Sequence, residues 1–175
     1  MPLSDKQAGV LKGMILALVI AGVVLAAGAW MIPQSWLPGD APSARMTLAA
    51  RCVLFAGFWL LATIGTLARH RFFTPQDIDG SGLTTGTETA KVHQAVLQNT
   101  LEQTVLASLV YFAFAFLAPA GLLGALPAAV VLFWLGRALF WHGYARGAGG
   151  RALGFALTFY PTVILFAVTV ILTLI

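Results

Sequence analysis

Five predominantly apolar stretches follow one another along the chain, and segments rich in turn-forming or charged residues separate them. A helix needs about 20 mostly apolar residues to cross the hydrocarbon core of a bilayer. The pattern therefore predicts five membrane-spanning helices, which cover residues 12–32, 47–68, 94–118, 121–143 and 152–174.

Turn chemistry marks the breaks between these stretches. Pro33 begins the first break, and the Pro119-Ala120-Gly121 turn forms the third. The fourth break contains the glycine-rich segment 147–150. The second break, at 69–93, is the long polar loop. Because irregular backbone cannot face lipid with its polar groups unpaired, we expect an all-α integral membrane bundle. The Thr-rich run at 84–90 indicates a helix start, with a threonine oxygen as cap.

The first apolar stretch also has the form of a secretory signal. Lys6 and Lys12 flank its start, and Ala27-Gly28-Ala29 imitates a cleavage site made of small residues. We expect this segment to be retained as a membrane helix.

Composition agrees with a membrane protein, since 59% of residues are hydrophobic and 9% charged, against about a quarter charged in soluble domains. With the N-terminus in the cytoplasm, seven Lys and Arg residues lie at or near cytoplasmic ends and two near the other side. This positive-inside bias accounts for the net charge of +4 without a nucleic-acid partner. The short loops suit a bacterial inner membrane, although the charge bias would also suit an endoplasmic reticulum.

Two charged residues lie inside predicted spans. Glu102 is 18 residues before Ala120, and Arg137 is 17 after it, so a hairpin at that turn places them level. At 1.5 Å per residue both are about 26 Å from the turn, near the cytoplasmic edge of the bilayer. A lone charge there costs on the order of 2–3 kcal/mol, so we expect them to pair or to face a polar cavity. Asn99, at i−3, shares the helix face of Glu102.

Two interpretations of these polar residues stay open. They either cross-link helices and hold no ligand, or they form a functional pocket. The segment RALFWHGYARGAGGR at 137–151 adds Phe140 and Tyr144 to the stripe of Arg137, and places Arg151 after a glycine-rich turn. Tyr144 would anchor a head group or donate a hydrogen bond to a thiolate; the alternative is an ordinary interfacial aromatic belt.

The histidines and Cys52 lack metal-ligand spacing, so we predict no metal.

Two segments together resemble a known family. LTTGTETAKVHQAVLQNTLEQ at 83–103 carries Leu-Thr-Thr-Gly followed by Asn-x-x-Glu, and 137–151 carries Arg-x6-Tyr-x6-Arg. This combination resembles the membrane-associated proteins in eicosanoid and glutathione metabolism (MAPEG), the superfamily of leukotriene C4 synthase and microsomal glutathione transferases. The resemblance covers 47–175 and implies a MAPEG-like four-helix membrane domain there. Residues 1–46 would add an N-terminal transmembrane helix and a connecting loop.

The resemblance also implies a homotrimer that binds glutathione between neighbouring subunits and takes a lipophilic partner from the bilayer. Asn99 and Glu102 would contact glutathione, and Arg137 would support the site. Tyr144 would line it, and Arg151 would stabilise the thiolate. A cation beside a thiol favours the nucleophilic thiolate. Tyr144 and Arg151 are therefore the candidate catalytic residues, and all five are candidate glutathione-binding residues.

Three positions depart from the family pattern. Ala95 stands where glutathione-using members carry an Arg that grips a carboxylate, Phe140 replaces a common tyrosine, and Gln103 replaces an aromatic residue. Losing a charge-assisted contact costs roughly 1.5–3 kcal/mol, or one to two decades in affinity. Lys91, one turn further out, would compensate if its long stem reaches back.

We therefore expect a membrane-embedded glutathione (or other thiol) transferase or peroxidase acting on lipophilic electrophiles or lipid hydroperoxides. The alternative is a non-catalytic membrane assembly or lipid-binding module on the same scaffold. Ala95, Phe140 and the first helix, 12–32, which would dock a membrane-protein partner, favour that alternative. An ion-conducting role has less support, because no polar stripe follows the spans.

Overall fold

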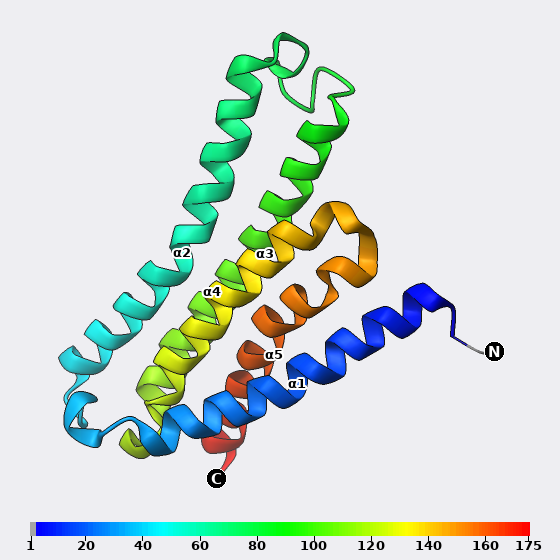
Figure 1. The fold of residues 1–175 in the computed structure, drawn as a ribbon. Coiled ribbons are helices and arrows are strands. Elements are labelled where there is room, and N and C mark those ends of the chain that lie inside the picture. The colour runs from blue at the N-terminus through cyan, green and yellow to red at the C-terminus, as the bar shows by residue number, and fades with distance from the viewer. Residues whose placement is uncertain (1–2) are drawn as a thin grey trace.

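Helices make up the regular secondary structure of the computed structural model, which describes residues 3–175 (Figure 1). The all-α prediction is confirmed, and each predicted span lies on one long helix, whose ends differ from the predicted ones by up to seven residues. The long helices are α1 (Asp5–Met31), α2 (Pro42–Phe73), α3 (Glu88–Leu117), α4 (Ala125–Gly143) and α5 (Gly147–Leu174). Single 3-10 turns lie between them: η1 (Gln34–Trp36), η2 (Pro75–Asp77), η3 (Ala120–Leu122) and η4 (Tyr144–Arg146).

Four segments of the described chain are long and apolar enough to cross a membrane. Three of them are α1, α2 and α3, and the fourth, Ala120–Leu174, contains both α4 and α5. Since α4 and α5 fold back on each other through η4 (Figure 1), this last segment is a helical hairpin. Five separate crossings stay a prediction.

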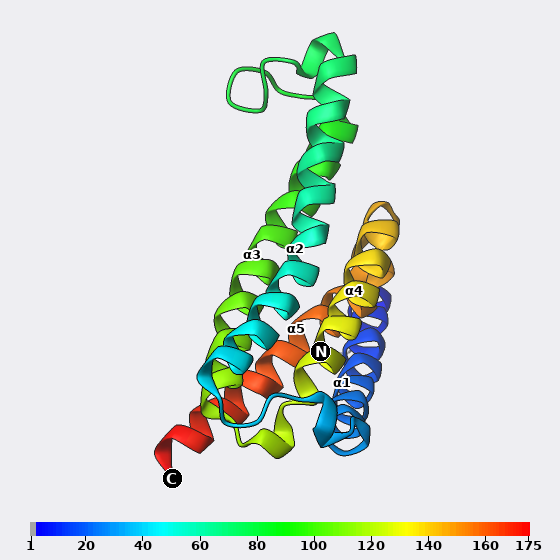
Figure 2. The same cartoon turned by 90° about the vertical axis from the view of Figure 1, so that its left-hand side faces the viewer.

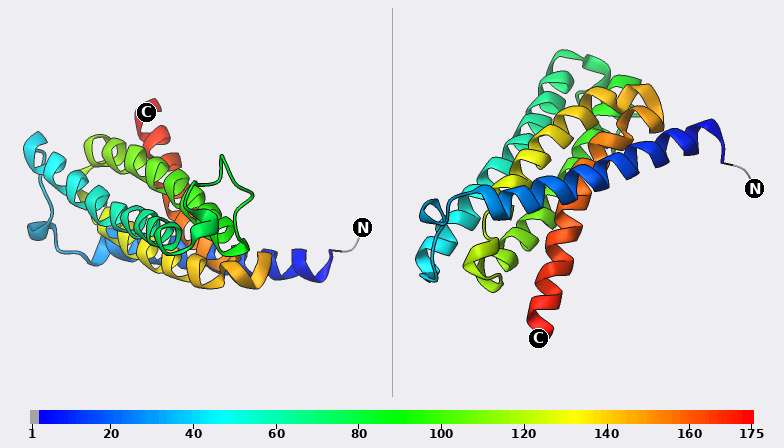
Figure 3. Two further views of the ribbon diagram at one scale, coloured as in Figure 1. Left: turned by 90° about the horizontal axis from the view of Figure 1, so that it is seen from above. Right: turned by 60° about the horizontal axis from the view of Figure 1, so that its bottom comes forward.

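The helices form two hairpins with α1 laid alongside. α2 packs on α3, α4 packs on α5, and α1 packs on α5 and α4. Figure 2 shows the α2–α3 hairpin reaching well beyond the α4–α5 turn, and Figure 3 shows α1 crossing α5 obliquely. The start of α1, the α2–α3 loop and the α4–α5 turn therefore lie at the same end of the bundle.

The tight α3–α4 hairpin that the sequence predicts is only partly formed. The two helices are joined by a short turn, but α3 packs chiefly on α2 and α5, and α4 on α5 and α1. Residues at equal distances from the turn are consequently not forced into contact.

Small residues bring α1, α4 and α5 close together. A Cβ on Gly28 of α1 would lie 2.7 Å from the carbonyl oxygen of Gly124, and a Cβ on Gly154 of α5 would collide with the backbone nitrogen of Phe140. Such close approach is how membrane helices gain van der Waals contact. These glycines therefore fix α1 and α5 against α4.

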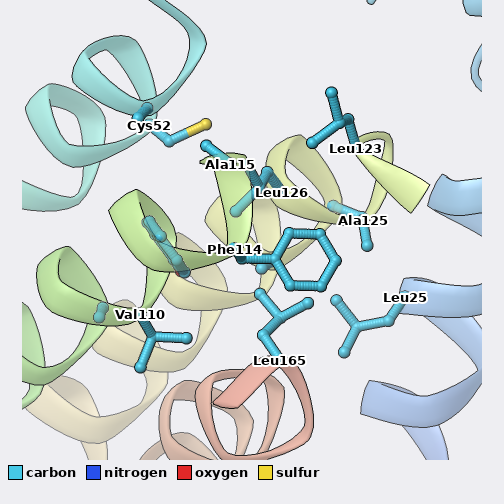
Figure 4. Close-up of a cluster of buried hydrophobic side chains, with 14 of the residues drawn as sticks. Leu25, Cys52, Val110, Phe114, Ala115, Leu123, Ala125, Leu126 and Leu165 are labelled. Atoms are coloured by element: carbon cyan, nitrogen blue, oxygen red, sulfur yellow. The ribbon is translucent and has the colours of Figure 1, made fainter. Parts of the chain in front are cut away.

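The apolar core lies toward the other end of the bundle. Figure 4 shows the ring of Phe114, from α3, among Leu25 of α1, Leu126 of α4 and Leu165 of α5. Cys52 of α2 borders the same cluster. All five long helices thus share one core.

A buried arginine closes this end. Nη1 of Arg45 donates to the carbonyl oxygens of Ala115 (3.0 Å) and Ala118 (2.7 Å), and Nη2 contacts Asp40 at 2.8 Å. The last carbonyls of a helix lack intrahelical partners, and a cation there also complements the helix dipole. Arg45 therefore ties α2 to the C-terminal end of α3.

A buried carboxylate fastens the opposite end. Asp77 accepts hydrogen bonds from the backbone N–H (2.7 Å) and the hydroxyl (2.6 Å) of Thr87, and its Oδ2 lies 2.8 Å from Nε2 of His70. Thr87 also caps α3 by accepting from the N–H of Ala90 at 3.2 Å, which confirms the predicted cap. The two hydrogen bonds from Thr87 hold the pKa of Asp77 below its usual value.

Candidate functional site

Arg137 links three helices from the interior of the bundle. Its side chain is 1% exposed. Nε donates to the hydroxyl of Thr158 on α5 at 3.0 Å, and Nη1 donates to Oδ1 of Asn99 on α3 at 2.9 Å. The guanidinium carbon lies 4.4 Å from the ring centroid of Phe140. One cation on α4 thereby orients an amide from α3 and a hydroxyl from α5.

The remaining nitrogen of this guanidinium is unsatisfied. Nη2 of Arg137 is buried and has no hydrogen-bond partner among residues 3–175. A buried donor without an acceptor carries a desolvation penalty, and the penalty is larger when the group is charged. An additional acceptor beside Nη2 would therefore be strongly favoured.

A cavity of about 440 Å³ opens beside this network, lined by residues of α1, α3, α4, η4 and α5. Its polar lining includes Asn99, Tyr144 and Arg151, and its apolar wall includes Phe140 and Phe155. Small-molecule sites are typically apolar cavities of this size with a few convergent polar groups. The cavity has the size and the lining of a ligand site.

Arg151 and Tyr144 are held together within the cavity. The guanidinium carbon of Arg151 lies 4.3 Å from the ring centroid of Tyr144, and that ring meets Phe140 edge-on at 5.4 Å. A cation over an aromatic face is attracted by the ring quadrupole. The contact fixes a positive charge over the face of the Tyr144 ring.

Glu102 lies apart from this group. It is exposed on the outer face of α3, between the exposed Leu101 and Val105. Its Oε1 accepts from Nε2 of Gln98 at 3.0 Å. Among the described residues it forms no ion pair with Arg137. Of the two outcomes that the sequence left open for these charges, pairing across the hairpin is therefore not the one found.

The physical reason why Glu102 does not reach Arg137 is the rotation of α3 about its own axis relative to α4. Positions i and i+3 are about 60° apart around a helix, so Asn99 turns toward α4 while Glu102 turns away. Since α3 packs mainly on α2 and α5, Asn99 reaches Arg137 and Glu102 does not. The sequence spacing predicts that Asn99 and Glu102 share one helix face, but in the structure Asn99 points into the bundle and Glu102 points out of it.

A second cavity, of about 380 Å³, lies between the α2–α3 loop and the start of α3. Ala95 lines it, flanked by Arg71 and Lys91. Nη2 of Arg71 donates to Oε1 of Gln94 at 3.1 Å. Gln98 lines the same cavity while it donates to Glu102, so one residue of the cavity wall contacts the outer carboxylate.

The structure thus brings four of the predicted site residues together, namely Asn99, Arg137, Tyr144 and Arg151, and leaves Glu102 on another face. Sequence reasoning did not find Thr158, the α5 partner of Arg137. Its one signal is a hydroxyl within a membrane span, and Tyr160 and three further threonines of the same span share that signal. The residues that α1 contributes to the cavity, Val10 and Met14, carry no signal at all, because valine and methionine are ordinary in a membrane helix.

The model of the MAPEG family matches residues 14–171. Comparison with curated proteins gives no match, and comparison with solved structures gives none either. The matched region begins within α1 and is therefore longer than 47–175, which carries the motifs. Four membrane-capable segments agree with the match in indicating an integral membrane protein. The chain belongs to the MAPEG family.

Proposed function

We propose that the protein is a membrane-embedded transferase or peroxidase that uses glutathione, or another thiol, on lipophilic electrophiles or lipid hydroperoxides. Membership of a family associated with glutathione and eicosanoid metabolism supports this proposal. The observation that carries it is the convergence of Asn99, Tyr144 and Arg151 in one largely apolar cavity. Such a cavity suits a lipophilic reactant, while its polar groups suit a thiol.

The chemistry assigned to this cavity depends on its cation and its phenol. Bound glutathione supplies a thiol, whose thiolate attacks the electrophilic carbon as the bond to the leaving group breaks. Arg151 stabilises the negative charge on sulfur, because a cation lowers the pKa of a neighbouring thiol. Tyr144, fixed beneath that cation at 4.3 Å, is placed to donate a hydrogen bond to the same sulfur.

Arg137 and Asn99 act as supports in this proposal. The bond between Nη1 and Oδ1 leaves the amide N–H₂ of Asn99 free to donate toward the cavity that the residue lines. The unpartnered Nη2 would gain an acceptor from a ligand carboxylate or carbonyl. Both residues therefore orient a peptide rather than react with it.

Glutathione is a tripeptide with two carboxylates, and binding these carboxylates requires cations at some distance from its thiol. Ala95 does not supply one, but Arg71 and Lys91 line the cavity that contains Ala95. We assign carboxylate binding to these two residues. The departure at position 95 then changes which side chain grips the peptide, and the fit to glutathione is retained.

The outward carboxylate of Glu102 supports a homotrimer. A charge exposed between apolar residues at membrane depth is costly unless it meets a partner or water. A neighbouring subunit covering the outer face of α3 would bury this carboxylate beside the peptide's amino group. In the same proposal the chain crosses the bilayer five times with its N-terminus in the cytoplasm of a bacterial inner membrane, as the charge bias indicates.

Ligand binding and turnover test the proposal directly. Millimolar glutathione should raise the melting temperature of the purified protein by mass action, and the protein should conjugate chlorodinitrobenzene. Arg151→Leu should abolish turnover, whereas Arg146→Leu, the removal of an exposed arginine outside the cavity, should leave it unchanged. Neither a thermal shift nor turnover in the wild type would overturn the proposal.

One observation favours the alternative, a non-catalytic assembly or lipid-binding module. Arg137 already bonds to Asn99 and Thr158 within the chain, which is how a purely structural cross-link would look. In that case Glu102→Gln should weaken the oligomer, and thiol-dependent activity should be absent from both forms. A membrane-protein partner on the lipid-facing side of α1 belongs to this alternative.

A further inference from the structure

A third cavity adjoins the candidate site on the side of α1. It measures about 340 Å³ and lies against the first three turns of that helix. Val10, Met14 and Ala148 line both this cavity and the 440 Å³ cavity that contains Arg151. The same few side chains therefore form a partition between the two spaces.

The side chains of this partition are held in place by the close packing of α1 on α5. A Cβ on Gly13 would lie 3.0 Å from the backbone nitrogen of Leu153 and 3.2 Å from Cβ of Ala152, so α1 and α5 touch at this level. One and two turns further on, Ala17 and Ala21 are fully buried. Ala17 and Ala21 pack in one cluster with Ala156 and Leu157 of α5. Small residues at every fourth position allow such close contact, and they hold Val10 and Met14 at a fixed height beside the cavity.

We propose that Val10 and Met14 are specificity-determining residues, which set the length of the acyl or alkyl chain that the site accepts. This inference rests on the proposed function only in taking the Arg151 cavity as the place of the lipophilic ligand. The ligand is a single-chain amphiphile with its polar end at Arg151 and Tyr144. Its chain runs along the aromatic wall and stops at Met14.

The charges and shapes of the two cavities support this ligand. The cations Arg151 and Lys6 line one cavity each, and no acidic residue is among those that line either. An anionic head group is therefore favoured over a cationic one. Methionine is unbranched and flexible, so it fills the junction without closing it permanently.

Changing the size of the partition should change the preferred chain length. Met14→Ala joins the two cavities, and each methylene that newly finds an apolar wall adds about fourfold to affinity. We expect the ratio of affinities for an 18-carbon over a 12-carbon fatty acid to rise at least tenfold in this variant. Met14→Trp fills the junction and should lower the same ratio at least tenfold.

The measurement is competition against a fluorescent fatty acid, with the full-length protein in lipid nanodiscs and with empty nanodiscs as the blank. Val23→Ala is the matched control, because Val23 is 62% exposed on α1 and lines neither cavity. Val10→Ala should shift the ratio in the direction of Met14→Ala. Melting temperatures of all variants verify that α1 stays packed.

The inference is overturned if the wild type binds fatty acids of neither length, or if the ratio is the same in Met14→Ala, Met14→Trp and the wild type. This outcome differs from failure of the proposed function. A shifted ratio without any glutathione-dependent turnover would keep the inference and reject the transferase. Glutathione-dependent turnover with the same ratio of fatty-acid affinities in all variants would keep the transferase and reject the inference.

Discussion

Nη1 of Arg137 donates a 2.9 Å hydrogen bond to Oδ1 of Asn99, and not to the carboxylate of Glu102 three residues further along the same helix. The cation on α4 is thus neutralised by no acid of the described chain and is only partly satisfied, because Nη2 has no partner there. Burial of an incompletely paired cation opposes folding. Its presence is explained if a ligand completes it.

Arg137→Met should separate structure from function. An apolar side chain of similar length removes a buried, incompletely paired charge, whose burial opposes folding. We expect the free energy of unfolding to change by less than about 1 kcal/mol or to rise, while glutathione-dependent turnover falls at least tenfold. Thermal unfolding and a turnover assay on the same preparation measure both.

Asn99→Leu is the counterpart of this variant. It leaves the guanidinium buried with a second unpaired nitrogen, and should cost about 2–3 kcal/mol in stability. If the two variants destabilised the protein equally, Arg137 would be a structural cross-link, and the ligand-binding role assigned to Nη2 would be wrong.

Periodicity and turn chemistry predicted the long helices because each span is a continuous apolar run that ends at a turn. The relative rotation of α3 and α4 could not be predicted in the same way. It depends on which small residues allow close approach, as Gly154 does at Phe140, and such contacts join distant parts of the chain. For that reason the spacing alone could not show that Asn99, and not Glu102, is the residue that contacts Arg137.

The family motif located Tyr144 and Arg151, and the structure joins them in one contact. Neither spacing nor resemblance indicated that α1 lines the site. Its residues there are apolar, and nothing distinguishes a cavity wall from a lipid-facing surface in a helix that is apolar all round. Only the packing of α1 on α5 identifies Val10 and Met14.

Ala95→Arg should strengthen glutathione binding. The new guanidinium would enter the cavity lined by Arg71 and Lys91, where a charge-assisted bond to a carboxylate contributes roughly 1.5–3 kcal/mol. We expect the dissociation constant for glutathione to fall about ten- to a hundredfold. Isothermal calorimetry measures it, with Ala95→Gln as the uncharged control. A rise in the constant for Ala95→Arg would show that the peptide's carboxylates lie elsewhere.

Glu102→Gln should preserve the fold of a single chain while it weakens the thiol site. The amide keeps a hydrogen bond with Gln98, because its oxygen replaces Oε1 as the acceptor. It loses the charge offered to the peptide's amino group, which costs about 1.5–3 kcal/mol of binding. Calorimetry should show weaker glutathione binding and mass photometry an unchanged oligomer. An oligomer that dissociates without any change in affinity would favour the assembly module.

The loop that Asp77 fastens should be sensitive to acid. The pKa of Asp77 is lower in the folded chain than in the unfolded chain, chiefly because Thr87 donates two hydrogen bonds to the carboxylate. Its contribution is therefore fully present above the ordinary carboxyl pKa of about 4, and it is lost as the pH falls through the lowered value. We expect Asp77→Asn to melt at a lower temperature than the wild type at pH 6, with the difference shrinking below pH 4. A difference independent of pH would contradict this role.

Thiolate formation tests the central claim most directly. Glutathione titrated into the purified protein at neutral pH should produce a saturable ultraviolet difference absorbance of a thiolate in the wild type. The same absorbance should appear in Arg146→Leu and be absent from Arg151→Leu. No thiolate signal in the wild type, or an equal signal in Arg151→Leu, would contradict the assignment of this cavity as a thiol-activating site.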